Sequence, residues 1–309
     1  MKKNSILHNL ILLITFLLFL SCNNDLRSDE SIQNIETLNL QSRDGQTYED
    51  HEIFNTENFD FFGKEHNNAL DYALSQIDAK ENLAYNNIEI HTNHYFDYIY
   101  EPTSQFRNDV KDKSYKYIYE ENKNNPNLSL VASFRLKNGT AYPQIESYLS
   151  SLDGVLNSSL PFEEKVNVIR SLDSNISRDT NLIDDDKTFL LLTNSVARNS
   201  VTYWNTSLSD GWRDLIDVQI GNNPEVSVET YDINWSFVAK ADIVGFIREF
   251  GRGALTGAIR GAIIGALSSG GTGAIPGAII GALGWGAASG ARGAAIASGA
   301  AAVASFLID

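Results

Sequence analysis

The stretch DDDKTFLLLTNSVARNSVTYW, residues 184–204, decides the predicted fold class. Its apolar residues recur at the 3.6-residue spacing of an α-helix. The three aspartates that open it favour the positive end of a helix dipole. The predicted helix carries Phe189, Leu192, Val196, Ala197, Ser200, Tyr203 and Trp204. We expect Trp204 to lie in the core.

The segments that precede this stretch show the same period. The apolar positions of four further predicted helices are Leu70, Ala73, Leu74 and Ile77, then Phe106, Val110, Tyr117 and Ile118, then Ile145, Tyr148, Leu149, Leu152 and Val155, and finally Phe162, Val166, Ile169, Leu172 and Ile176. Pro143 and Pro161 stand where the last two would begin, a position that suits proline. Segments 86–100 and 128–136 are less regular, and Ile88-Glu89-Ile90 predicts a short strand. We therefore predict a mainly α fold, with a helical domain over residues 63–233.

The N-terminus carries a targeting signal. Lys2 and Lys3 precede an apolar run over residues 6–20, and Cys22 follows directly after a serine. The pattern resembles the lipobox of bacterial lipoproteins, with Phe19 where leucine is usual. The resemblance implies that residues 1–21 are removed and that Cys22 is acylated, for example by palmitate, as the first mature residue. The alternative is a plain signal peptide or signal anchor, although the run is short for a membrane span.

The remaining composition describes an acidic chain of 309 residues with a polar linker near its start. Residues 22–62 have little apolar periodicity, and we expect them to form a polar tether, partly disordered, behind the lipid anchor. The net charge is −15, and residues 253–309 hold only two arginines and one aspartate, which leaves −16 for residues 1–252. Such a charge repels a phosphate backbone and argues against nucleic acid as a partner.

The segment 234–309 contains a row of small residues. Glycines recur every four residues at Gly253, Gly257, Gly261 and Gly265, and the same spacing resumes at Gly273, Gly277 and Gly281. Residues 257–267 repeat as 273–283, with Arg260 replaced by Pro276. Glycines four apart share one helix face, so a second helix can approach closely. We predict a Gly/Ala-rich helical hairpin that mediates membrane association or self-association. A soluble hairpin packed on the body and a flexible low-complexity tail are the alternatives.

These features resemble known lipoproteins. Residues 253–291 are similar to the glycine-zipper two-helix domains of Gram-negative envelope lipoproteins. The whole layout resembles uncharacterised lipoproteins of Bacteroidota, which share a lipobox, a glycine-rich end and the stretch Gly-x-x-His-Asn-x-x-Leu-Asp, here residues 63–71. The likeness implies a lipid-anchored location in the cell envelope, with the outer membrane expected, and no particular activity. A weaker, compositional likeness links the tail to pore-forming bacteriocins.

Few residues carry a signature of chemistry. His91 and His94 have metal-ligand spacing only if they lie on a helix, and no motif completes a site with them. His66 lies five residues before Asp71 without a placed nucleophile. We therefore predict a non-enzymatic protein with no cofactor and no metal, whose partners are membrane lipid and, through the tail, a second copy of the chain. The alternatives are a membrane-active toxin and, with less support, a hydrolase that uses His66 or the His91/His94 pair.

Overall fold

The mainly α prediction is confirmed by the structure, which is a computed structural model. It describes residues 53–77, 85–100, 129–139, 142–206, 210–221, 235–250, 292–297, 299 and 301, and no strand lies among them. The elements are η1 (Thr56–Asn58), α3 (Asp60–Gln76), α4 (Tyr85–Tyr100), α7 (Leu130–Asn138), α8 (Pro143–Leu156), α9 (Phe162–Arg178), α10 (Asp184–Asn205), α11 (Asp210–Gly221) and α12 (Trp235–Phe250). Residues 292–297 of the tail are also helical.

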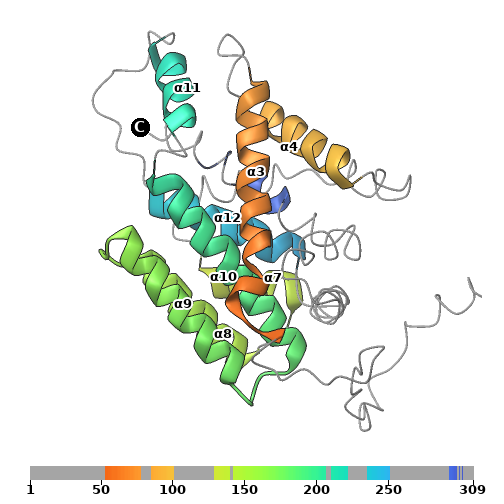
Figure 1. Ribbon diagram of the computed structural model, residues 1–309, viewed down its shortest axis with the longest axis vertical. Helices are drawn as coiled ribbons and strands as arrows, with labels where there is room; N and C mark the ends of the chain where they lie inside the picture. The colour runs from red at the N-terminus through yellow and green to blue at the C-terminus, as the bar shows by residue number, and fades with distance from the viewer. Residues whose placement is uncertain are drawn as a thin grey trace, which may run out of the picture. The chain divides into compact units, whose positions relative to one another are not determined.

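Helix α10 is the centre of the bundle (Figure 1). It packs against α3, α8, α9 and α12, while α4 lies on α3 and α7 contacts α8 and α12. Every residue from Lys187 to Arg198 is buried, and so are Trp204 and its neighbour Tyr203. A helix that is covered all round belongs to the interior of a fold. The expectation that Trp204 lies in the core is therefore confirmed.

Aromatic side chains join four helices into one core. Phe62 of α3 meets Phe246 of α12 edge to face, with ring centroids 5.6 Å apart. Phe189 of α10 stacks on Phe246 at 6.2 Å and also contacts Phe134 of α7 at 5.3 Å. Aromatic pairs at such distances stabilise a core beyond the area that they bury. The cluster fixes α12 against α3, α7 and α10.

The ends of the helices follow their sequence signals. Pro143 occupies the first turn of α8, where its missing N–H costs no hydrogen bond. The three aspartates 184–186 lie in the first turn of α10, and Arg178 lies in the last turn of α9, each at the favourable end of a helix dipole. Helix α7 ends at Gly139, whose φ of 79° lies in the left-handed region that favours glycine.

The predicted strand over residues 88–90 is wrong, because these residues belong to α4. The buried side chains of α4 are Ile88, Thr92, Tyr95 and Phe96, a spacing typical of one helix face. Ile90 is 59% exposed, so the alternation of two isoleucines around a glutamate reflects a helix surface. Segment 128–136, which gave no clear prediction, contributes α7.

The packed body includes residues on both sides of the range 63–233. Ile53, Phe54 and Phe59, which fall in the expected polar tether, are buried in the core. Helix α12, which falls in the expected tail segment, packs on α7, α8 and α10. Both additions have the same physical reason, since large apolar side chains at these positions leave water on folding.

Some expectations fall outside the described residues. These are the signal, Cys22, the helix predicted from Phe106, Val110, Tyr117 and Ile118, and all seven glycines of the predicted zipper, Gly253, Gly257, Gly261, Gly265, Gly273, Gly277 and Gly281. Within the described ranges, no helix combines the length and apolar content that crossing a bilayer requires.

Candidate functional site

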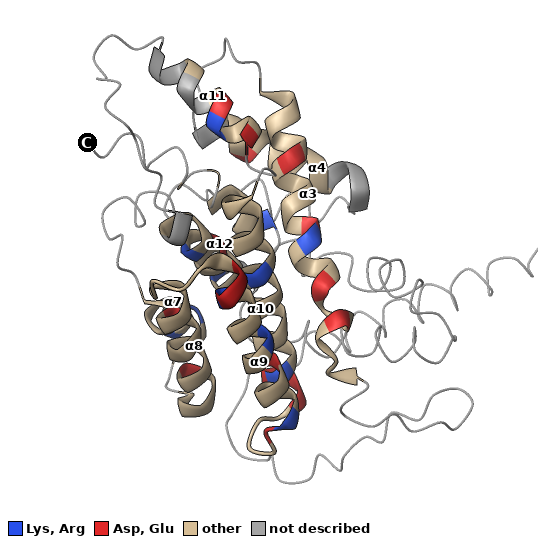
Figure 2. Ribbon diagram, turned by 60° about the vertical axis from the view of Figure 1, so that its left-hand side comes forward, with Lys and Arg blue, Asp and Glu red and all other residues tan. Residues whose placement is uncertain are grey.

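The inner faces of α3, α9, α10 and α12 carry an unusual number of polar side chains. Figure 2 shows charged positions on the helices inside the bundle as well as on the outer ones. The buried polar residues include His66, Asp173, Thr193, Asn194, Ser195, Arg198, Ser200 and Asp242, each at most 3% exposed. A polar group taken out of water is costly unless a partner compensates it. The partners of these groups therefore define the candidate site.

The first cluster surrounds the carboxylate of Asp242 on α12. One carboxylate oxygen, Oδ2, accepts hydrogen bonds from the Ser200 hydroxyl and from Trp204 Nε1, the latter at 3.1 Å. The other, Oδ1, lies 3.2 Å from Nε2 of His66, and both side chains are fully buried. The two atoms are close enough for an ion pair but are not aligned as a hydrogen bond. Asp242 thus ties α3 and α10 to α12.

The contact made by the second ring nitrogen of His66, Nδ1, indicates which ring nitrogen carries a hydrogen. Asn67 Nδ2 donates to the carbonyl of Asn199, so its Oδ1 faces His66 Nδ1 at 2.9 Å. That oxygen only accepts, and Nδ1 therefore carries a hydrogen. Burial raises the pKa of Asp242, and His66, Ser200 and Trp204 oppose this by stabilising the carboxylate.

The side chains of His66, Asp242 and Ser200 are not arranged like the base and the nucleophile of a hydrolase. Nucleophilic catalysis needs a base in contact with the hydroxyl that it activates. Here the carboxylate of Asp242 stands between the two, because Ser200 and His66 each face one of its oxygens. All three side chains are also fully buried. The geometry is that of a polar tie between helices.

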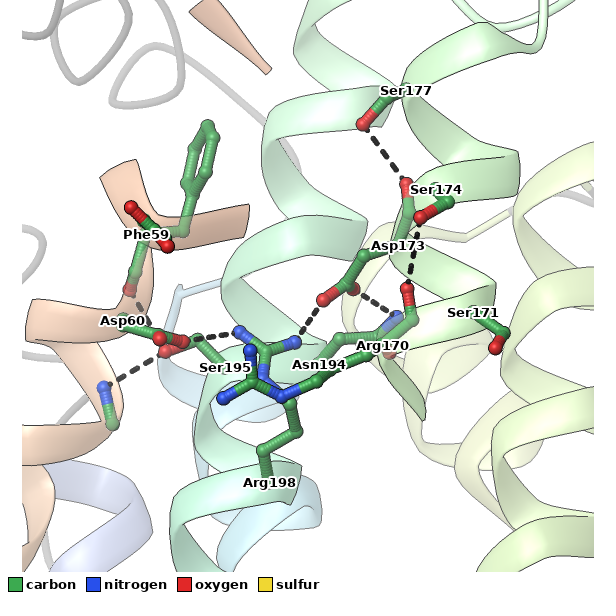
Figure 3. A network of polar contacts seen from close by, with 12 residues as sticks. Phe59, Asp60, Arg170, Ser171, Asp173, Ser174, Ser177, Asn194, Ser195 and Arg198 are labelled. Carbon is green, nitrogen blue, oxygen red and sulfur yellow. Dashed lines mark hydrogen bonds and ion pairs between the residues drawn. The ribbon is translucent and has the colours of Figure 1, made fainter. Parts of the chain in front are cut away.

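A second cluster is centred on Arg198 of α10 (Figure 3). Its guanidinium bridges two carboxylates, Asp173 on α9 and Asp60 on α3, the latter at 2.5 Å. Asn194 Nδ2 donates to the other oxygen of Asp173 at 2.8 Å. One turn away, the Ser195 hydroxyl donates to the carbonyl of Phe59 at 2.8 Å. The cluster fixes the start of α3 on the middle of α10.

Asp173 is the carboxylate of this cluster that is most perturbed. It is fully buried, and desolvation raises its pKa from an ordinary 3.8 to about 6. The charge of Arg198 and the hydrogen bond from Asn194 oppose that rise. Because removal from water outweighs both, Asp173 gains a proton at mildly acidic pH.

His66 and Asp71, which the sequence places five residues apart, have different partners. Asp71 instead accepts a hydrogen bond from the hydroxyl of Tyr203 at 2.7 Å, and that hydroxyl accepts one from Trp212 Nε1 at 3.1 Å. Burial and the neighbouring Asp71 raise the pKa of Tyr203, so it remains a neutral donor. The partner of His66 is Asp242, which is 176 residues further along the chain.

His91 and His94 both lie on the helix α4, which gives them the spacing that could converge. His94 is exposed and its Nδ1 lies 2.7 Å from the hydroxyl of Tyr72 on α3, while His91 is half-buried. Across the described part of the chain, no three histidine, cysteine, aspartate or glutamate side chains gather closely enough to hold a metal ion. The contact between His94 and Tyr72 joins α4 to α3.

A third feature is a close helix contact between α12 and the tail. A Cβ atom added to Gly245 would lie 2.7 Å from Cβ of Ala297 and closer still to the carbonyl oxygen of Gly293. Real Cβ atoms essentially never lie that near a neighbour, so only glycine fits. This contact belongs to the glycine-rich segment, although it lies beyond the predicted row that ends at Gly281.

Sequence reasoning missed Asp242, Arg198 and Gly245. One signal was available for Asp242, which interrupts the apolar run FVAKADIVGFI together with Lys240. A charge within an apolar helix marks either a surface position or a buried pair. Comparisons of the chain with protein-family models, curated proteins and solved structures found no match.

Proposed function

We propose that this chain is a non-enzymatic lipoprotein of the cell envelope, anchored through Cys22, whose glycine-rich tail associates with membrane lipid or with a second copy. The anchor rests on the lipobox-like sequence around Cys22. The role of the tail rests on its glycine spacing and on one structural observation, the contact between α12 and residues 292–297.

That contact supports the proposal because it shows which kind of packing the tail sequence uses. Gly245 and Gly293 bring two helix backbones together where a side chain would separate them. Residues 294–297 of the tail are at most 1% exposed. Small residues promote helix association by close packing, in lipid as well as in water. The sequence repeats this four-residue spacing at 253–265 and 273–281, and on a helix these glycines would share one face.

The role of the body as a scaffold is supported by what its polar groups do. His66, Asp173, Arg198 and Asp242 each contact groups on other helices and thereby hold α3, α9, α10 and α12 together. Side chains of the kinds that perform acid–base chemistry are thus used to specify packing. We infer that the body holds residues 292–297 of the tail in place.

Cell fractionation tests the proposal. Wild-type cells should hold the protein in the membrane fraction, and Cys22→Ser should shift most of it to the soluble fraction. In intact cells, chemical crosslinking should give oligomers that Gly261→Leu or Gly277→Leu abolishes. The matched control is Gly154→Leu, because a Cβ at Gly154 of α8 would meet nothing within 4 Å. Oligomers that survive both tail variants would refute self-association.

The same proteins separate an anchored scaffold from a membrane-active toxin. A scaffold leaves liposomes intact, whereas a toxin releases an enclosed dye. Dye release by the purified Cys22→Ser protein would overturn the scaffold proposal in favour of the toxin. Two results together would refute any role of the tail. These are the absence of crosslinked oligomers in wild type and the complete release of the Cys22→Ser protein into the soluble fraction.

A further inference from the structure

An open pocket lies where four helices of the body meet. Its lining comes from α8, the connection between α8 and α9, α9 itself, α10 and α12, and consists of Leu156, Leu160, Phe162, Lys165, Val201, Asn205 and Ala239. Five of these seven side chains are apolar, and Lys165 and Asn205 are the polar ones. A concave, mainly apolar surface with a few polar groups is the usual form of a site for a small ligand.

The pocket contains a buried cation. Lys165 is only 8% exposed, and its Nζ donates to the carbonyl oxygen of Leu156, the last residue of α8, at 2.8 Å. An ammonium can donate three hydrogen bonds, so this bond fixes its position without using every hydrogen. Burial lowers the pKa of the Lys165 ammonium, because removal from water disfavours its charge. A negatively charged ligand in the pocket would compensate that charge.

The start of α9 adds to the positive potential. The helix begins at Phe162, which lines the pocket, and Pro161 before it provides no side-chain cap for the first turn. The N-terminus of a helix carries a partial positive charge that favours anions. Glu163 and Glu164 in the same turn are both exposed and already supply negative charge there. The surroundings therefore favour an anion with a single charge over one with several.

The dimensions of the pocket limit the ligand to a small group. Its volume is about 40 Å³, and one water-sized group needs roughly 10–15 Å³, so about three non-hydrogen atoms fit inside. A carboxylate group has that size. Leu160 is 37% exposed and Phe162 is half-buried, so the apolar lining continues to the solvent. An apolar chain attached to the carboxylate would contact this part of the lining.

We propose that this pocket binds a small monocarboxylate, with its carboxylate beside Lys165 and a short apolar chain along Leu160 and Phe162. Asn205, the last residue of α10, is held at the pocket by the bond from its Nδ2 to the carbonyl of Val201 at 2.8 Å. The site lies in the helical body and does not involve the tail. It therefore adds the binding of a small ligand to the proposed scaffold.

Saturation-transfer NMR on the full chain that carries Cys22→Ser tests the proposal, with pentanoate as the probe. We expect pentanoate to bind in the millimolar range and inorganic phosphate not to displace it. The uncharged 1-pentanol should bind about tenfold more weakly, because it loses the charge-assisted hydrogen bond to Lys165. Equal binding of 1-pentanol, or displacement of pentanoate by phosphate, would overturn the assignment of the ligand as a monocarboxylate.

Lys165→Met removes the ammonium and keeps an apolar chain in its place. We expect this variant to bind pentanoate about tenfold more weakly. Lys187→Met is the matched control, because Lys187 is also buried, at 4% exposed, and lies about 27 Å along α10 from Asn205. Unchanged binding of pentanoate by Lys165→Met, or an equal loss in Lys187→Met, would overturn the site.

Leu160→Ala keeps the test decisive if Lys165→Met fails to fold. Leu160 is partly exposed and lies in the connection between α8 and α9, so its truncation leaves the helices intact. We expect pentanoate to bind several-fold more weakly to this variant, and acetate, which has no chain to contact Leu160, to bind as it does to the parent protein. Unchanged binding of pentanoate by Leu160→Ala would overturn the proposal. Absence of pentanoate binding by the parent protein would do the same and would leave the proposed roles of the anchor and the tail untouched.

Discussion

Replacement of Asp173 by asparagine gives the sharpest test of the electrostatics inside the bundle. Asp173 has a pKa of about 6 in the folded protein against an ordinary value of 3.8. Between these two values the folded state binds more protons than the unfolded state. The free energy of unfolding therefore falls as pH rises from about 4 to 6, and it levels off above that range. A shift of about 2 units corresponds to about 3 kcal/mol, at roughly 1.4 kcal/mol per unit.

Asparagine keeps the shape of the side chain but does not titrate. The difference in unfolding free energy between wild type and Asp173→Asn should therefore become less favourable to wild type by roughly 2.5 kcal/mol between pH 4 and pH 7. Urea denaturation followed by circular dichroism at pH 4, 5, 6 and 7 measures it. The substitution also leaves Arg198 with Asp60 as its partner in the ion pair, and this loss of stability does not depend on pH. It changes the size of the free-energy difference between the two proteins but not its dependence on pH.

Asp179→Asn provides a control of opposite sign. A backbone hydrogen bond from Asn181 lowers the pKa of Asp179, so its contribution is present above its ordinary value and is lost as pH falls. The unfolding free energy of wild type minus that of Asp179→Asn should therefore increase as pH rises. If the Asp173 difference also grew with pH, attraction by Arg198 would outweigh desolvation, and the assignment of cause would be wrong.

Further substitutions test the packing. Gly63→Ala should destabilise the fold by about 1–3 kcal/mol, because its methyl group would collide with α10, whereas Gly154→Ala should stabilise it by about 0.5–1 kcal/mol, since the space is open. Equal effects in thermal melts would contradict the difference in space. Tyr203→Phe should cost about 1–3 kcal/mol, because it leaves the buried Nε1 of Trp212 without its acceptor; a neutral effect in urea titrations would mean that water replaces that hydroxyl. Phe134→Ala should cost about 3–5 kcal/mol, and a loss below 1 kcal/mol would place Phe134 outside the core.

The sequence was sufficient for helices with one apolar face. Helices α3, α8, α9 and α10 were predicted from the period of their apolar residues, and Pro143 marked the start of one of them. Helices α4 and α7 gave weak signals, because polar residues interrupt their inner faces. Thr92 in α4 and Ser133 in α7 are both fully buried, although their types are more common at the surface. A pattern of apolar and polar residues assigns such positions to the solvent-facing side of the helix, although they lie on its buried side.

The candidate site was only half visible in the sequence. The stretch at residues 63–71 was noted through a resemblance, and its members make contacts with other helices: Gly63 admits α10, His66 faces Asp242, and Asp71 binds Tyr203. The partners lie more than 130 residues away along the chain. Spacing within one helix can show which side chains share a face, but it contains no information on which distant carboxylate will meet them.

The tail shows why its two leading interpretations could not be separated by pattern alone. A row of glycines lets helices approach in lipid and in a protein core for the same steric reason, so the row predicts contact without naming the partner. For Gly293 and Ala297, which lie beyond the row, the partner is Gly245, which falls in an apolar stretch that gave no separate signal. Because Gly245 matches Gly293 backbone to backbone, the last part of the tail finds its complement in its own body. Among the described residues, the small-residue face of the tail at Gly293 and Ala297 is therefore occupied by α12 and forms part of the protein's own core.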